Sequence, residues 1–242
     1  MNGYAPETYG DCIAGIYDEL YPTVEPAMID TLARLAASGP ALELGIGTGR
    51  VALPLQARGV CVHGVDASSN MVACLREKPG GAEIPVTMAD FSAFQLPDRY
   101  ALVYVPFNTF FALLSQEDQV RCFQTAAAHL VAGGRFLIEV FVPDLSRFDR
   151  GQRVHANRVG VDSLTLDASI HDPVAQRVDT QHMLVRDGNV RLYPVRIRYA
   201  FPAELDLMAR LAGLRLEHRW AGWREEPFSA EAQSHVSVYV RD

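Results

Sequence analysis

Residues 43–50 have the sequence ELGIGTGR, and this glycine-rich segment constrains the fold more than any other part of the chain. It follows a short apolar run at residues 40–42, which predicts a buried strand, and it precedes a helical pattern that begins at residue 51. Glycines between a strand and a helix let the backbone pass close to a ligand. The segment therefore predicts a loop that binds a nucleotide-type cofactor.

The spacing of the glycines argues against a dinucleotide. That fingerprint requires Gly-x-Gly-x-x-Gly with a pyrophosphate at the helix N-terminus, but the position of its third glycine is Arg50 here. The glycines occur instead at Gly45, Gly47 and Gly49, and an acid, Glu43, lies two residues before the first of them. This pattern resembles motif I of the class I S-adenosylmethionine (SAM)-dependent methyltransferases, whose cofactor has no phosphates.

The next segment resembles the same family. Residues 60–65 predict a second strand that ends at Asp66, 21 residues after Gly45. An acid at this place bonds ribose hydroxyls, a geometry that serves NAD equally well. The residues after the acid, including Met71, resemble the part of the family that lies beside the adenosine.

Two later segments extend the resemblance. Residues 84–91 predict a third strand that ends in Asp90 and Phe91, which resembles the family's adenine-edge motif. The resemblance implies that Asp90 accepts from the exocyclic amine and that Phe91 covers the ring. Residues 101–105 predict a fourth strand, and residues 106–111 match the segment that lies under the methionine part of the cofactor.

The resemblance implies SAM, released as S-adenosylhomocysteine, as the cofactor. The positions that match the family's cofactor site are Tyr9, Tyr17, Glu43, Gly45, Ile46, Gly47, Asp66, Ala67, Met71, Ala89, Asp90, Phe91, Pro106 and Phe107. Plainer interpretations stay open for some of them. Asp66 and Asp90 are also favoured N-caps for the helices that follow, and Phe107 is also typical of an ordinary core.

Three residues are candidates for the chemistry. Asn108 is a polar amide between apolar residues at a strand end, where it needs a partner. Tyr17 belongs to a tyrosine-rich N-terminal segment similar to the lead-in helix that covers many small-molecule methyltransferases. His182 is the polar residue of the late β-rich region that we expect to reach the acceptor. We expect no paired histidine and carboxylate in the pocket, which favours an amine acceptor because an amine has less need of a general base.

The alternation of strands and helices through residue 142 predicts an α/β fold. The resemblance implies a doubly wound, seven-stranded, mostly parallel sheet, completed by two strands near the C-terminus. Period-two alternation predicts an inserted antiparallel β-segment, with an Asp187-Gly188 hairpin turn in it. Other expected elements are helices at 27–38, 116–131 and 203–212, a Gly133-Gly134 turn before a strand at 135–141, and β-segments at 161–170 and 176–201. The expected parts of this single domain are a lid at 1–26, the SAM-binding core at 27–142, the insert at 143–201 and the C-terminal part at 202–242.

Composition limits the partners. The net charge of −7 lacks the basic bias of a nucleic-acid binder, so a DNA or RNA methyltransferase is disfavoured. The four cysteines include no Cys-x-x-Cys pair, so no metal site or disulfide framework is predicted. No apolar run approaches the length of a membrane span, and the N-terminus lacks the pattern of a signal peptide. We expect a cytoplasmic protein without a membrane or nucleic-acid partner. The sequence leaves the oligomeric state open, a homodimer included.

The sequence therefore predicts a SAM-dependent methyltransferase that acts on a small-molecule or short-peptide acceptor. The resemblance extends to antibiotic-pathway N-methyltransferases, and it favours an amino sugar, a peptide α-amine or another natural-product amine. Transfer to oxygen or carbon of a secondary metabolite is the first alternative. A dinucleotide-dependent oxidoreductase and a SAM-binding protein without transfer activity are the others.

Overall fold

The computed structural model describes residues 1 and 3–242. Its main sheet has seven strands in the order β10-β11-β5-β4-β1-β2-β3, and only β11 runs antiparallel to its neighbours, β10 and β5. The predicted seven-stranded, mostly parallel sheet is confirmed. The strands are β1 (Ala41–Leu44), β2 (Val62–Asp66), β3 (Val86–Met88), β4 (Tyr100–Val105), β5 (Leu130–Phe141), β10 (Leu214–Trp220) and β11 (Ser234–Arg241).

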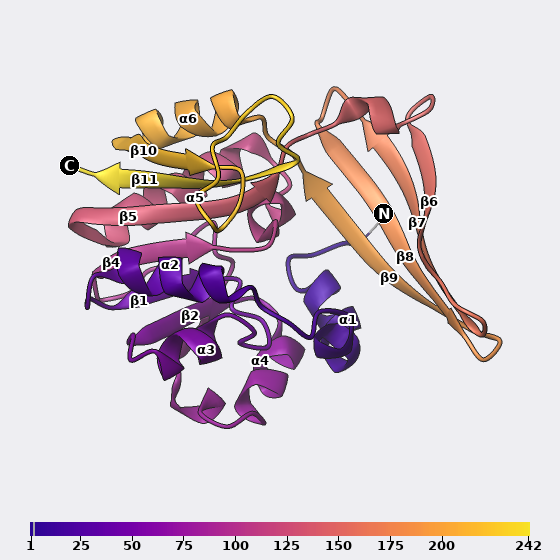
Figure 1. The fold of residues 1–242 in the computed structure, drawn as a ribbon, viewed down its shortest axis with the longest axis horizontal. Helices are drawn as coiled ribbons and strands as arrows, with labels where there is room; N and C mark the ends of the chain where they lie inside the picture. The colour runs from indigo at the N-terminus through magenta and orange to yellow at the C-terminus, as the bar shows by residue number, and fades with distance from the viewer. Residues whose placement is uncertain (2) are drawn as a thin grey trace.

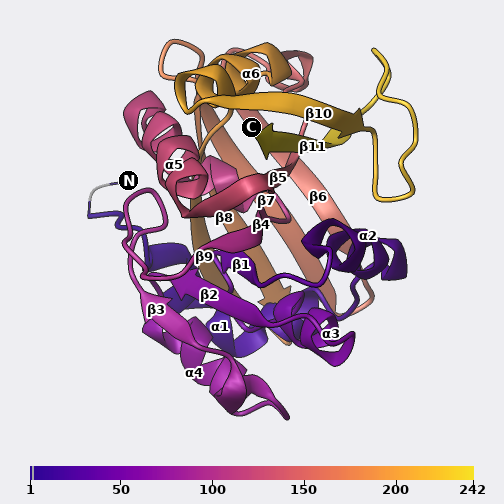
Figure 2. The ribbon, with the colours of Figure 1, turned by 90° about the vertical axis from the view of Figure 1, so that its left-hand side faces the viewer.

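Helices cover both faces of this sheet. The helices are α1 (Thr8–Leu20), α2 (Pro26–Ala36), α3 (Ala52–Ala57), α4 (Ser69–Arg76), α5 (Gln116–His129) and α6 (Pro202–Leu211), with short 3₁₀ turns η1 (Gly81–Glu83), η2 (Thr109–Ala112) and η3 (Leu145–Arg147). One apolar core, around Leu32 and Leu55, joins α2, α3 and α4 to one face. A second core, around Phe123 and Met208, joins α5 and α6 to the other face. Figure 2 shows α2 and α3 on the side of the sheet away from α5.

The insert forms a separate antiparallel sheet in the order β6-β7-β8-β9. Its strands are β6 (Gln152–Val159), β7 (Ser163–Asp172), β8 (Arg177–Arg186) and β9 (Asn189–Arg198). The predicted hairpin is confirmed, because Arg186 pairs with Asn189 and the turn residues Asp187 and Gly188 both have positive φ. The sequence analysis missed β6. This sheet stands beside the edge at which the parallel strands end, so it faces the loops expected to bind the cofactor (Figure 1).

The helix α1 lies between the two sheets and contacts α4 and β9 (Figure 1). Polar side chains fasten it to the core. The Ser68 hydroxyl donates to Asp11 at 2.5 Å, and the Thr48 hydroxyl donates to Asp18 at 2.7 Å. Lys78 pairs with the same Asp18 carboxylate at 2.5 Å. The N-terminal helix is therefore held against the glycine loop and the start of α4.

Several expected boundaries differ from the structure. The strand expected at 84–91 is shorter, because β3 covers only Val86–Met88 and Asp90 follows it. The Gly133-Gly134 pair does not form a turn ahead of β5 but lies within that strand. Tyr100 pairs with Leu130 and Leu102 with Arg135, so the extra residues between them bulge out of the ladder. The division of the chain into a lid, a core, an insert and a C-terminal part stays a prediction.

None of the helices in the described part of the chain is both long enough and apolar enough to cross a membrane.

Candidate active site

The glycine loop follows β1 and is tied to the end of β2. The backbone N–H of Gly45 donates to the Val65 carbonyl at 2.8 Å, and that of Gly47 donates to a carboxylate oxygen of Asp66 at 2.7 Å. Gly47 has φ +55°, and a Cβ there would meet no protein atom closer than Met71 Cε at 3.8 Å. The loop therefore leaves open space at Gly47 on the side where a ligand would lie.

Asp66 occupies the end of β2, where the sequence analysis placed a ribose-binding acid. Its second carboxylate oxygen accepts from the backbone N–H of Ser68 at 2.8 Å. Burial raises the pKa of Asp66, against hydrogen bonds from Ser68 and Gly47 that lower it. The N-cap of α4 is Ser68, whose hydroxyl accepts from Met71 N–H at 3.1 Å. Asp66 is therefore not that cap, and it shapes the loop while keeping further lone pairs for a ligand.

Glu43 lies in β1 beneath the loop and is only 2% exposed. The Tyr104 hydroxyl donates to it at 2.8 Å. Burial raises the pKa of Glu43 to about 8, although the hydrogen bond from Tyr104 and the charge of Arg50 both oppose the shift. Arg50 also donates to the Thr23 carbonyl and stacks over the Phe107 ring, 4.6 Å from its centroid. Its Nε is buried without a hydrogen-bond partner among the described residues.

The turn after β4 is strained. Phe107 and Asn108 have φ values of +55° and +64°, a region that residues other than glycine rarely occupy. Glu139 on the neighbouring β5 accepts from the Phe107 N–H at 2.7 Å and from the Trp223 indole at 2.6 Å. The Asn108 side-chain oxygen accepts from the Phe141 N–H at 2.7 Å. The Asn108 amide oxygen is thus committed to the backbone, and only its NH₂ group is available to a ligand.

These loops line a cavity of about 620 Å³ that extends from the carboxyl edge of the parallel strands to the inserted sheet. Its volume is in the range of small-molecule sites. The predicted site residues that line it are Tyr9, Tyr17, Glu43, Gly45, Ile46, Gly47, Asp66, Ala67, Met71, Asp90, Phe91, Pro106, Phe107, Asn108 and His182. Ala89 is the exception. It packs against the core, and its N–H donates to the Asp66 carbonyl at 2.9 Å.

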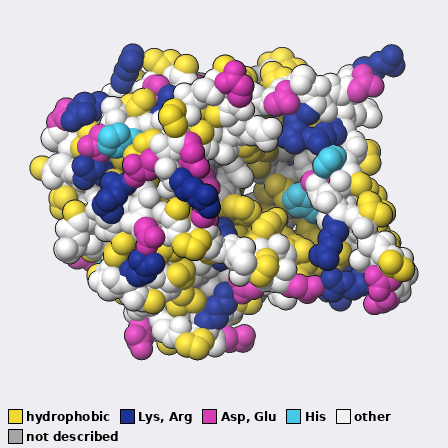
Figure 3. Space-filling model, in the orientation of Figure 1, with side chains coloured by type: hydrophobic (Ala, Val, Ile, Leu, Met, Phe, Trp, Pro, Cys, Tyr) yellow, Lys and Arg dark blue, Asp and Glu magenta, His cyan; other side chains and the backbone are white. Residues whose placement is uncertain are grey.

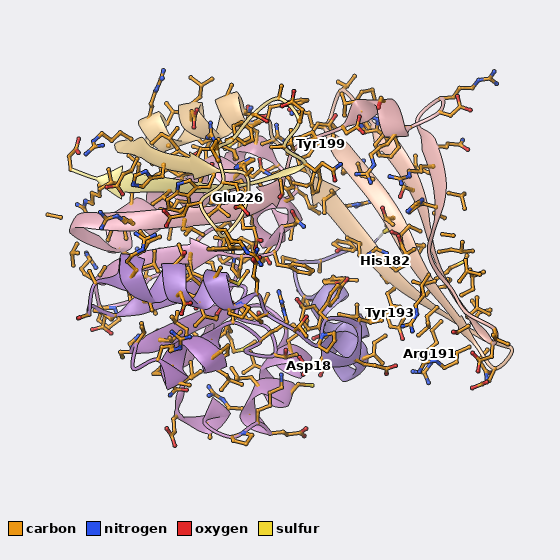
Figure 4. The ribbon with its side chains drawn as sticks, viewed as in Figure 1. Asp18, His182, Arg191, Tyr193, Tyr199 and Glu226 are labelled. Carbon is orange, nitrogen blue, oxygen red and sulfur yellow. The ribbon has the colours of Figure 1, made fainter. Side chains whose placement is uncertain are left out.

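The opposite wall contains a pair that the sequence analysis did not expect. His182 on β8 is hydrogen-bonded through Nδ1 to the Asp167 carboxylate on β7, its cross-strand neighbour, and both side chains line the cavity. The expectation that the pocket has no histidine–carboxylate pair was wrong. Burial alone would raise the pKa of Asp167, but hydrogen bonds from His182 and Asn157 outweigh it and hold that pKa below its usual value. In Figure 4, His182 and Tyr193 lie on the part of the sheet next to α1, from which Asp18 projects.

Tyrosines of α1 form a third wall. The ring centroids of Tyr17 and Tyr21 lie 5.0 Å apart, and Tyr21 lies 4.9 Å from Phe107 with the rings edge to face. Burial raises the pKa of Tyr17 to about 12 and that of Tyr9 further. Both phenols therefore stay protonated at neutral pH, as hydrogen-bond donors inside the cavity.

The sequence analysis missed several polar residues of the cavity. They are Arg50, Arg147, Arg153, His155, Asn157, Asp167 and Thr180. Arg50 was visible only as the residue that breaks the dinucleotide fingerprint. Its position one residue after the last loop glycine was the signal from which its place in the cavity could have been predicted. Among residues 1 and 3–242, no group of three or more histidine, cysteine or acidic side chains is arranged to hold a metal ion.

The residues present fit SAM. Open space at Gly47 leaves room for the cofactor beside the loop. The Asp66 carboxylate suits the ribose hydroxyls of SAM, and the unpaired Nε of Arg50 suits its carboxylate.

The comparisons with known proteins agree with a site for SAM. The family described as "Methyltransferase domain" matches residues 41–134. The solved structure of the CcbJ methyltransferase from Streptomyces caelestis is 40% identical in sequence, with 99% of this chain and 100% of that chain covered and a TM-score of 0.92. The chain belongs to the class I SAM-dependent methyltransferases. The enzyme therefore uses SAM as its methyl donor.

Two more distant proteins are similar over nearly the whole enzyme. The cypemycin N-terminal methyltransferase of Streptomyces sp. is 24% identical, over 98% of each chain. The SAM-bound structure of CalS10 from Micromonospora echinaspora, described as an amino pentose methyltransferase involved in calicheamicin biosynthesis, has a TM-score of 0.71 at 19% identity, over 94% of this chain and 97% of that one. At this low sequence identity, the similarity to CalS10 shows a shared fold and no more.

Proposed function

We propose that the enzyme transfers the methyl group of SAM to an amine of a small molecule or short peptide. The observation that carries methyl transfer to a bound acceptor is the position of the His182–Asp167 pair, on the cavity wall opposite the cofactor loops. A base at this place serves a hydroxyl as well as an amine, so the choice of nitrogen rests on the relatives. One of them is named as an N-terminal methyltransferase and another as an amino pentose methyltransferase. The alternatives are transfer to oxygen or carbon.

SAM supplies a methyl group that its sulfonium has already activated for direct displacement. The enzyme's own residues then have two tasks, to orient the acceptor and to remove a proton. An amine must be neutral to attack, and after attack the nitrogen carries a proton that has to leave. The free Nε2 of His182 accepts that proton, while Asp167 accepts a hydrogen bond from Nδ1–H and stabilises the imidazolium.

Orientation falls to residues on the other walls. The protonated Tyr17 phenol and the free NH₂ group of Asn108 donate hydrogen bonds to the acceptor, and the aromatic rings around them exclude water. We assign both residues to positioning, whereas His182 acts on the reacting nitrogen.

The first experiment is calorimetric titration with S-adenosylhomocysteine and, separately, with NAD. Binding of the sulfur compound alone is expected. Labelled SAM is then offered with a panel of amino sugars, free peptides and N-acetylated peptides, together with matched hydroxyl compounds. Transfer to amines that disappears on acetylation supports the proposal. Transfer to hydroxyl compounds alone would contradict it.

We also propose that the enzyme is a homodimer joined through the outer face of the inserted sheet, the face away from the cavity. The strand register places a row of apolar side chains there, several of them more than half exposed: Val154, Val159, Ile170, Val190 and Leu192. Four strands of eight to ten residues present a footprint of roughly 600 Å². This is close to the ~800 Å² per partner of a standard interface. The register also places the ion-paired Asp179 and Arg196 beside Ile170, and a mainly apolar face of this kind suits a two-fold contact between copies.

Light scattering after size exclusion tests the dimer. We expect the wild-type enzyme at twice the chain mass and the variant Val154→Lys/Leu192→Lys at the monomer mass. Val174→Lys alters another exposed valine, in the turn between β7 and β8, and should leave the dimer intact. A wild-type monomer would contradict the proposal, as would equal dissociation in both variants.

We place the enzyme in the cytoplasm. Its four cysteines are all free thiols, and Cys12 and Cys61 are exposed. Exposed free thiols persist in a reducing compartment. Recovery in the cytosolic fraction is expected, and recovery among secreted proteins would contradict this placement.

A further inference from the structure

The cavity has acids near the cofactor loops and bases near the inserted sheet. The cofactor end contains Glu43, Asp66 and Asp90, with Arg50 as its cation. The end lined by η3 and the inserted sheet contains Arg147, Arg153, His155 and His182, with Asp144 and Asp167 as the acids. In the space-filling view, Lys, Arg and His side chains gather on the sheet side of the hollow, above its apolar floor (Figure 3).

Arg147 and Arg153 are the centre of the basic end. Arg147 ends η3, Arg153 lies in β6, and both line the cavity. Neither guanidinium forms an ion pair or hydrogen bond with any residue that the structure describes. Burial, and then the nearby charge of Arg153, lower the pKa of Arg147. The exposed Arg147 and the half-buried Arg153 thus both line this end of the cavity without an ion-pair partner among the described residues.

The neighbouring acids form no ion pair with either arginine, although the charges of both arginines, after the hydrogen bonds from Ser146, help to lower the pKa of Asp144. One carboxylate oxygen of Asp144 accepts from both the N–H and the hydroxyl of Ser146, at 3.0 and 2.6 Å. Asp167 accepts from His182. In a chain of net charge −7, a pair of unmatched arginines in a cavity is a local exception. Their planar forks match the oxygens of a carboxylate or phosphate, and like charges held together lower their repulsion by binding an anion.

We propose that the acceptor carries an oxyanion group, a carboxylate or a phosphate, that binds between Arg147 and Arg153 while its amine faces His182. This assignment rests on the proposed methyl transfer to an amine and adds the chemical class of the acceptor. Only an acceptor that has both groups, at the right separation, then reaches both ends of the wall. The arginine pair selects the acceptor, and the cofactor end stays independent of it.

Two double variants test the assignment. Arg147→Gln/Arg153→Gln removes the pair, and Arg150→Gln/Arg210→Gln removes the same charge from two exposed arginines that do not line the cavity. Inorganic phosphate and acetate are titrated calorimetrically into each protein at low ionic strength, with and without S-adenosylhomocysteine. We expect the affinity for at least one anion to fall about tenfold or more in the first variant, and less than about twofold in the second. The anion that the wild-type enzyme binds more tightly identifies the oxyanion group of the acceptor as a phosphate or a carboxylate.

A second arm uses matched acceptors in the transfer assay. Glucosamine is compared with glucosamine 6-phosphate, and a peptide amide with the free acid. We expect the anionic member of a pair to have the higher kcat/KM, and we expect Arg147→Gln/Arg153→Gln to abolish that preference. Absence of anion binding by the wild-type enzyme, or equal losses in both variants, would overturn the assignment. Failure to bind S-adenosylhomocysteine would instead overturn the proposed function. The two failures are distinguishable, because the anion titration without S-adenosylhomocysteine tests only the arginine pair.

Discussion

The Glu139 carboxylate accepts a hydrogen bond from the backbone N–H of Phe107 at 2.7 Å and so holds the strained turn that forms one wall of the cavity. Its other oxygen is occupied by Trp223 from the segment between β10 and β11. One half-buried side chain therefore connects the C-terminal part of the chain to the cofactor site. Burial raises the pKa of Glu139 despite both hydrogen bonds.

Replacing Glu139 with alanine should destabilise the enzyme by about 2–3 kcal/mol, because two partly buried donors lose their acceptor. It should also weaken S-adenosylhomocysteine binding, since Phe107 would no longer be held at positive φ. Glu139→Gln keeps one acceptor and should cost about half as much. Thermal unfolding and calorimetry measure the two effects. Full stability of Glu139→Ala would show that the turn needs no such support.

The space beside Gly47 gives a second prediction. Gly47→Ala adds a methyl group that points into the cavity, and we expect S-adenosylhomocysteine affinity to fall by about 30-fold or more. Gly59→Ala is the matched control, because Gly59 also has positive φ and open surroundings but lies outside the cavity. Both variants should lose about 1 kcal/mol of stability from backbone strain. Equal affinities in the two variants would mean that the cofactor does not approach Gly47.

The glycine loop and the site residues beside it could be predicted from the sequence, for a physical reason. Parallel strands end at one edge of the sheet, so residues that follow β1, β2, β3 and β4 meet there whatever the rest of the chain does. Spacing along the chain was therefore enough to bring Gly47, Asp66 and Asp90 to one cavity. The side chain of Ala89 lies outside the cavity lining, because a one-residue offset beside a short strand turns it to the core.

The inserted sheet was harder to predict. Its hairpin turn was evident from Asp187 and Gly188, but the pairing of Asp167 with His182 depends on the register between β7 and β8. A shift of one residue would have put either side chain on the outer face. The local sequence does not determine the register between β7 and β8. It can be assigned only when the side chains of the apolar outer face and of the polar inner face are known. His182 was expected on this wall, but its pairing with Asp167 could be recognised only from the structure.

The His182–Asp167 pair predicts which residue turnover depends on. In His182→Gln, kcat should drop about 100-fold with KM for SAM nearly unchanged, because the methylated nitrogen loses the group that accepts its proton. Asp167→Asn should lower kcat by a smaller factor. His218→Gln, which alters a histidine stacked on Trp220 outside the cavity, is the control. An unchanged kcat in His182→Gln would assign the residue to structure alone.

Glu43 makes the stability of the cofactor-free enzyme depend on pH. Its pKa is about 8 in the folded state, far above that of an exposed glutamate, so the folded chain holds a proton that the unfolded chain releases. The stabilisation is complete below the unfolded pKa, near 4.5, and is lost as the pH rises through about 8. Glu43→Gln cannot titrate, so its stability relative to the wild type should increase across that window by a few kcal/mol, on the order of 2–4. Denaturant unfolding of both proteins at pH 5, 6.5 and 8.5 measures the difference. Parallel curves would show that Glu43 is ionised in the folded enzyme, stabilised by Tyr104 and Arg50.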